Sequence, residues 1–168
     1  MITGIEANII RIDDDAIPAW TDELKCDPGE VGEIVVKGNL VTREYKNNAK
    51  ANALAKIPDP RDGGIWHRMG DLGCIDKKGR LWFYGRKNHR VRSENGTLFT
   101  IPVESVFNQH PDVFRSALIG VVKLGSKFQE PIICIQKETG PLSGSNKSLR
   151  KELFDLAAKN ELTKGISK

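Results

Sequence analysis

The sequence predicts an α+β fold of two units, a β-rich unit over residues 1–85 and a smaller α+β unit over residues 86–168. Strand-like segments dominate up to about residue 85, whereas the remainder reads strand, helix, strand, strand, helix. Between the two, five of the seven residues 86–92 are Arg, Lys or His. A break in composition of this kind is typical of a boundary between compact units.

Composition indicates a globular chain. Hydrophobic residues make up 39% and charged residues 29%, which predicts a packed core. The net charge of +4 is spread along the chain, so it suits an anionic ligand but does not by itself indicate nucleic acid. The three cysteines have neither disulfide-framework nor metal-ligand spacing. We expect no membrane span and a cytoplasmic location, because no apolar run approaches ~20 residues and no signal-type segment opens the sequence.

The elements of the β-rich unit follow from local patterns. Residues 2–12 alternate apolar and polar side chains, and residues 32–38 are β-branched between glycines, so both predict strands. Residues 41–45 are expected to extend the second strand or to form another. Residues 47–57 carry alanines and leucine on one side and predict a short helix, which Pro58 ends.

The chain is organised around a hairpin between Trp66 and Arg92. A strand ends in Gly70-Asp71, residues 76–79 form a tight turn, and an aromatic-rich second strand ends at Gly85-Arg86. Alternation places apolar side chains on both faces of the second strand, which predicts a hairpin covered on both sides. The residues expected in its core are Trp66, Trp82 and Phe83. Asp71 and Arg86 should therefore lie close together, where they could hold a sugar diol and an acidic group.

The second unit is expected to contain two helices. Asn95-Gly96 predicts a turn before a strand over residues 97–101, and Pro102 opens a helix. Two β-rich segments follow at 116–122 and 131–136. After a link at 140–145, residues 147–160 predict an amphipathic helix with apolar side chains at Leu149, Leu153, Leu156 and Ala157.

Four motifs in this order resemble those of the adenylate-forming enzymes, which include acyl-CoA synthetases, peptide-synthetase adenylation domains and firefly luciferases. They are Gly32–Gly38 with Tyr45-Lys46-Asn47, Trp66–Leu72, Leu81–Asn88 and Ile101–Glu104. Within this family, three segments are similar to the synthetases of bacterial long-chain olefin biosynthesis, often labelled fatty-acyl-CoA ligases. These segments are Asp14–Pro18, Gly64–Leu72 and Thr97–Pro102.

The resemblance implies a fragment of an AMP-forming acid ligase. Residues 1–85 would be the distal β-barrel piece of the large N-terminal domain, and residues 86–168 most of its mobile C-terminal lid. The full enzyme would use ATP and Mg²⁺ to convert a fatty acid into an acyl-adenylate, which then passes to CoA. In some olefin-pathway members, the β-hydroxyl of the acid instead closes a β-lactone.

The resemblance also assigns roles to three residues. Asp71 would accept hydrogen bonds from the ribose hydroxyls, Arg86 would contact the nucleotide, and Asn88 would be the hinge. The alternatives are a turn aspartate, a solvated strand-end arginine and an ordinary loop asparagine. No metal ligand or catalytic residue is assigned, because the adenylation lysine of the family is expected beyond Lys168.

The sequence departs from the family pattern at two places. Met69 stands where most members have Thr, and Ser93–Gly96 replaces a Gly-containing loop that lines the pantetheine channel. The second departure favours a product formed without CoA. The phosphate-binding loop and acyl pocket are absent from these 168 residues, so we expect the chain to act with the rest of its own polypeptide and to be inactive alone.

Other polar residues are interpreted as structural, and two other functions stay open. Glu33 is interpreted as a strand-end charge and Glu104 as a first-turn glutamate favoured by the helix dipole. The histidines at 67, 89 and 110 are interpreted as structural or surface residues. The aromatic residues beside the cations of 86–92 leave open a single-stranded nucleic-acid module, which salt-dependent binding would reveal. A non-catalytic remnant of the ligase fold is a third hypothesis.

Overall fold

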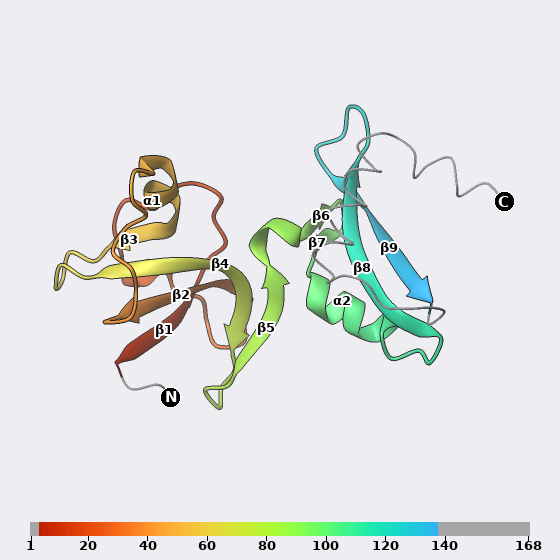
Figure 1. Ribbon diagram of the computed structural model, residues 1–168, viewed down its shortest axis with the longest axis horizontal. Coiled ribbons are helices and arrows are strands. Elements are labelled where there is room, and N and C mark those ends of the chain that lie inside the picture. Colours follow the sequence, from red (N-terminus) through yellow and green to blue (C-terminus); the bar gives the residue numbers. More distant parts are fainter. Residues whose placement is uncertain (1–3, 138–168) are drawn as a thin grey trace. The chain divides into compact units, whose positions relative to one another are not determined.

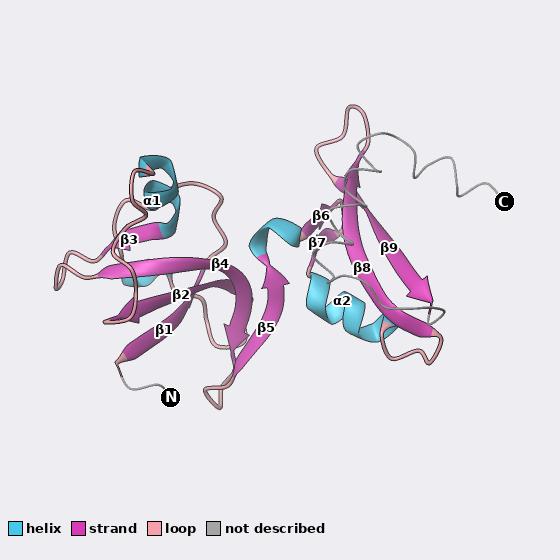
Figure 2. Ribbon diagram, viewed as in Figure 1, coloured by secondary structure: helices cyan, strands magenta, loops and turns pink. Residues whose placement is uncertain are grey.

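A computed structural model describes residues 4–137 of the 168-residue chain (Figure 1). It confirms the α+β class, with strands dominating and two α-helices among the described residues (Figure 2). The chain divides into two compact units, Met1–Asn88 and His89–Lys168, and each is described by itself. No helix within residues 4–137 is both long and apolar enough to cross a membrane.

The first unit is an antiparallel sheet in the order β1-β2-β4-β3, with β5 paired to β4 (Figure 1). Its elements are β1 (Ile5–Ile10), the 3-10 helix η1 (Asp22–Leu24), β2 (Gly32–Gly38), α1 (Ala49–Ala55), β3 (Lys56–Pro58), β4 (Ile65–Ile75) and β5 (Leu81–Arg86). A second 3-10 helix, η2 (Lys87–His89), follows β5. The long strand β4 is the centre of this unit, because β2, β3 and β5 all pair with it.

The core of the first unit is built around two stacked tryptophans. The rings of Trp20 and Trp66 lie 4.2 Å apart at an interplanar angle of 15°. Both side chains are fully buried, which confirms the predicted core position of Trp66. Aliphatic side chains from β1, β2, β3 and the loop before η1 complete the cluster, namely Ile10, Ile17, Val35 and Ile57.

A buried carboxylate ties the loop after β3 to this core. Asp59 is 1% exposed and accepts hydrogen bonds from Trp66 Nε1 at 3.0 Å, Lys37 Nζ at 2.7 Å and Arg61 Nη2 at 2.8 Å. The hydrogen bond from Arg61, followed by those from Lys37 and Trp66, holds the pKa of Asp59 far below its ordinary value despite its burial. The ionised carboxylate therefore orients the Trp66 ring.

The second unit contains two hairpins and one helix within its described part. They are β6 (Val91–Ser93) with β7 (Gly96–Leu98), α2 (Thr100–Phe107), and β8 (Val113–Val122) with β9 (Gln129–Lys137). Ala117 and Ile119 of β8 are fully buried. Glu104 is 3% exposed, and its Oε1 accepts a hydrogen bond from Leu118 N at 2.8 Å. Its role is structural, but the predicted reason is wrong, because Glu104 lies in the middle of α2 and joins that helix to β8.

Several predicted boundaries are wrong. The helix expected over 47–57 ends at Ala55, because residues 56–58 pair with β4 as β3. Residues 41–45 form a loop and not a strand. The strand expected over 97–101 stops at Leu98, since α2 begins at Thr100, two residues before Pro102. The predicted link at 140–145 and helix at 147–160 lie outside the described residues.

The prediction that both faces of the hairpin are covered is wrong for the described chain. Trp82 and Phe83, both expected in the core, are 51% and 48% exposed. Burial of a strand face depends on what packs over it, which alternation along the strand does not reveal. Trp82 instead donates its Nε1–H to Asp76 Oδ2 of the preceding turn at 3.0 Å.

Replacing Asp59 with Asn is expected to destabilise the first unit strongly at neutral pH and less in acid. The pKa of Asp59 is lowered from 3.8 by folding, so its ionised form adds stability above that value and loses it as the pH falls towards the folded pKa. Urea unfolding followed by tryptophan fluorescence at about pH 7 and about pH 2.5 measures the gap between wild type and variant. The control, Glu23→Gln, alters an exposed carboxylate. A gap of equal size at both pH values would contradict the role given to Asp59.

Candidate functional site

The candidate site lies where β4 bulges away from β2. Glu33 of β2 pairs with Leu72 and Val35 pairs with Arg68, so a single β2 residue faces three residues of β4, 69–71. Gly70 within this bulge has φ +66°, a conformation that glycine adopts without steric cost. The bulge carries Asp71 out of the regular β2–β4 pairing.

Asp71 and Arg86 lie directly opposite each other in the β4–β5 pair, as the sequence predicted. Arg86 Nη1 is 3.0 Å from Asp71 Oδ1. A second register shift lies between Leu72 and Gly73, next to Asp71 on β4, and Gly85, which precedes Arg86 on β5, has a positive φ of 113°. Two local irregularities therefore bring the carboxylate and the guanidinium together at the end of the hairpin.

The Asp71 carboxylate keeps unused hydrogen-bonding capacity. Its Oδ1 is buried and makes no hydrogen bond within residues 4–137, because the contact with Arg86 is an ion pair without hydrogen-bond alignment. A buried carboxylate oxygen that accepts no hydrogen bond is energetically costly, so a hydrogen-bond donor from a ligand would stabilise it. The Arg86 side chain is 60% exposed beside it. An ionised carboxylate of this kind can accept hydrogen bonds from two adjacent hydroxyl groups.

A buried ion pair between β2 and β4 lies next to the bulge. Arg68 donates from Nε and Nη2 to Glu33 Oε2 at 3.0 and 2.7 Å, and both side chains are about 2% exposed or less. The same guanidinium donates to the carbonyl oxygens of Asp13 and Asp15. Lys87 Nζ also lies 3.1 Å from Glu33 Oε2. Glu33 is thus structural and lies at the end of β2, as predicted, and the structure adds that its carboxylate is buried and paired.

Sequence reasoning missed this ion pair, although one signal was present. Arg68 lies two residues after the core residue Trp66, so strand alternation puts both side chains on one face. A charged side chain on a core face requires a buried partner of opposite charge. The identity of that partner depends on the β2–β4 register, which the sequence does not display.

Asn88, the predicted hinge, is the last residue of the first unit and is exposed. It lies within η2, and its φ is not positive; Asn47 is the single non-glycine residue with positive φ among residues 4–137. The position at the end of a unit is compatible with a hinge. The hinge function itself stays a prediction.

The histidines show no metal site. The described residues contain no cluster of three or more metal-ligating side chains. His67 Nδ1 lies 3.2 Å from the Ala55 carbonyl oxygen, and burial, followed by the nearby Lys56 charge, lowers its pKa. His110 Nδ1 accepts a hydrogen bond from Asp112 N at 3.2 Å. These contacts agree with structural roles.

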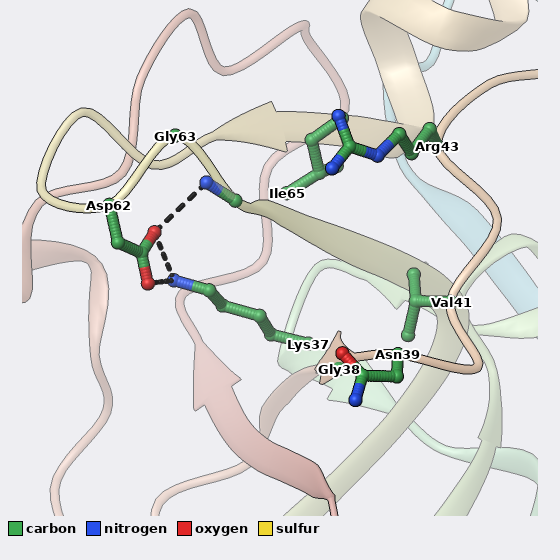
Figure 3. A pocket seen from close by; sticks show the side chains of 9 residues that line it. Lys37, Gly38, Asn39, Val41, Arg43, Asp62, Gly63 and Ile65 are labelled. Carbon is green, nitrogen blue, oxygen red and sulfur yellow. Dashed lines mark hydrogen bonds and ion pairs between the residues drawn. The ribbon is translucent and has the colours of Figure 1, made fainter.

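A hollow on the first unit lies beside Lys37, Arg43 and Asp62 (Figure 3). Lys37 Nζ contacts both Asp62 oxygens, at 2.6 and 2.7 Å, as well as Asp59. These hydrogen bonds outweigh partial burial and raise the pKa of Lys37. Because its main cation is already neutralised by two carboxylates, we assign no ligand to this hollow.

Comparison with known proteins yields no match to any family model, but it finds clear relatives. The chain is 42% identical over 166 residues to an olefin β-lactone synthetase of Xanthomonas campestris pv. campestris, covering 97% of this chain and 30% of that protein. It is 44% identical over 134 residues to an olefin β-lactone synthetase of Stenotrophomonas maltophilia, covering 78% and 24%. The chain is homologous to adenylate-forming ligases. A third relative, 32% identical over 108 residues, is an indoleacetate–CoA ligase of Aromatoleum aromaticum, covering 64% and 20%.

Solved structures agree with this homology. O-succinylbenzoate coenzyme A synthetase from Bacillus subtilis, in complex with ATP and magnesium, matches 87% of this chain with a TM-score of 0.62 and 27% identity. The match covers 26% of that structure. The α+β fold is thus that of the C-terminal part of AMP-forming ligases, and the chain spans less than a third of the length of the relatives named above.

Replacing Arg68 with Met is expected to lower the free energy of unfolding of the first unit by about 3 kcal/mol or more, because it removes the main partner of buried Glu33. Arg80→Met is the matched control, since the ion pair of Arg80 with Asp76 is exposed and worth about 1 kcal/mol at most. Urea unfolding of both variants gives the comparison. Equal losses in the two variants would show that the buried pair is unimportant.

Proposed function

We propose that this chain forms the ribose-binding and hinge region of an AMP-forming ligase that activates a fatty acid. The observation that carries the proposal is the Asp71–Arg86 ion pair, in which buried Asp71 Oδ1 accepts no hydrogen bond from residues 4–137. Residues 1–85 would end the large domain of the enzyme, and residues 86–168 would form most of its lid. Homology to olefin β-lactone synthetases and CoA ligases supports this assignment.

In the proposed first step, a carboxylate oxygen of the substrate attacks the α-phosphorus of ATP. The bond from this phosphorus to the bridging oxygen breaks, pyrophosphate leaves, and an acyl-adenylate forms. Asp71 would accept hydrogen bonds from the two ribose hydroxyls, and Arg86 would donate to a ribose oxygen or a phosphate. Mg²⁺ supplies positive charge to the phosphates when bound. We assign the metal and the phosphates to the rest of the polypeptide, which is expected to carry the phosphate-binding loop of the family.

For the second step, two products are considered. A thiol acceptor would give an acyl-CoA and AMP. Alternatively, the β-hydroxyl oxygen of the acid attacks its own acyl carbonyl, AMP leaves, and the hydroxyl proton passes to solvent, which gives a β-lactone. We favour the β-lactone because Ser93–Gly96, a β6–β7 turn, departs from the family's glycine-containing CoA loop. Two relatives above 40% identity are β-lactone synthetases.

The partners of the proposed enzyme follow from this reaction. They are ATP, a fatty acid that carries a β-hydroxyl group for the lactone product, and the remaining domains of the same polypeptide, without nucleic acid. CoA is the acceptor only for the thioester product. Because the reaction consumes ATP, we propose that it takes place in the cytoplasm.

In the full-length ligase, Asp71→Asn is expected to slow ATP–pyrophosphate exchange by a factor of about 100 or more, mainly through a higher KM for ATP, because the amide replaces a charged acceptor with a weaker one. Asp27→Asn, at an exposed loop carboxylate, is the control and should leave the exchange unchanged. Normal exchange in the Asp71 variant would refute the ribose assignment.

Incubating the full-length enzyme with ATP, Mg²⁺ and a long-chain 3-hydroxy acid is expected to yield AMP and a product lighter than the acid by one water, detected by mass spectrometry. The yield should not depend on CoA, because the nucleophile is within the substrate. Formation of an acyl-CoA with no lactone would favour the thioester reaction over the lactone.

A further inference from the structure

Lys87 joins the end of the organising hairpin to two distant parts of the first unit. Its ammonium group lies 3.1 Å from Glu33 Oε2 on β2 and donates to the Asp13 carbonyl oxygen at 2.9 Å. These partners precede it by 54 and 74 residues. The Lys87 side chain is only 13% exposed, which is unusual for lysine.

The Lys87 ammonium group shares these two acceptors with the Arg68 guanidinium. Glu33 Oε2 accepts three donors, two from Arg68 and one from Lys87, and the Asp13 carbonyl accepts from both cations. Holding a long side chain in one rotamer costs conformational entropy, which the two charge-assisted contacts offset. Arg68 alone already neutralises Glu33. The contact from Lys87 therefore serves mainly to attach the segment after β5 to β2.

The position of this attachment in the chain is informative. Arg86, immediately before Lys87, is the residue that faces Asp71 across the β4–β5 pair. Asn88, immediately after it, is exposed and ends the first unit. The backbone thus passes from an anchored residue to an exposed one within a single step. Hinges are short segments at the ends of elements that absorb changes in φ and ψ.

We propose that Lys87 is a positioning residue of the ligase: it fixes the backbone to the first unit so that hinge rotation begins at Asn88 and leaves Arg86 opposite Asp71. This inference deepens the proposed function and rests on it for the meaning of the rotation. Without the anchor, rotation would spread backwards into the end of β5 and displace the Arg86 guanidinium.

Hydrogen exchange measured by mass spectrometry on the full-length protein tests the anchor directly. Lys87→Met removes the charge at similar side-chain length, Lys87→Arg keeps it, and Lys78→Met is the control at an exposed lysine of the β4–β5 turn. In Lys87→Met, amides of residues 84–88 should exchange about tenfold faster while the remaining strands keep their protection. Lys87→Arg and Lys78→Met should match the wild type.

Unchanged exchange at residues 84–88 would overturn the inference. Faster exchange throughout the first unit would overturn it as well, because Lys87 would then serve general stability. Hydrogen exchange can be measured without catalysis. A failure of the wild-type enzyme to exchange pyrophosphate would therefore refute the proposed function but leave this test of the Lys87 anchor intact.

Steady-state kinetics then distinguish positioning from folding. We expect Lys87→Met to lower kcat of the complete reaction about tenfold while KM for ATP changes by less than about twofold, and Lys87→Arg to restore kcat. A loss confined to KM, or a failure of Lys87→Arg to restore turnover, would count against the positioning role.

Discussion

The buried carboxylate of Glu33 is the interaction on which the hairpin end depends. It connects β2 with β4 through Arg68 and with the segment after β5 through Lys87. Both cations also donate to the carbonyl oxygen of Asp13, and Arg68 donates to that of Asp15. A buried ion is stable only when such partners surround it, so the arrangement specifies where three segments must meet.

This ion pair and the bulge next to it together set the directions of Arg68 and Asp71. Arg68 is held inward by Glu33, and Gly70 turns the chain so that Asp71 points to a different partner across β5. The bulge frees Asp71 from the β2 pairing, and its buried Oδ1 forms an ion pair with Arg86 without a hydrogen bond from residues 4–137. The buried Arg68 and the proposed ribose-binding residue Asp71 therefore lie three residues apart in one strand, with Arg68 paired to β2 and Asp71 facing β5.

The exposed apolar side chains of β5 contrast with the cover that the sequence predicted. Leu81, Trp82 and Phe83 are each about half exposed, whereas periodicity predicted cover on both faces. The matched ligases are more than three times longer than the matched segment. The prediction inferred cover from alternation alone, which does not show what packs on a strand.

The sequence by itself determined the α+β class, most of the strands, the tryptophan core position at residue 66 and the encounter of Asp71 with Arg86. These features follow from short-range patterns, namely alternation, turn residues and strand ends separated by one tight turn. Only the tertiary structure decided the early end of α1 at Ala55, the exposure of Trp82, and the burial of Glu33 and Glu104. Each of these depends on pairing or packing between segments far apart in the chain, and a single sequence does not record the register of such contacts.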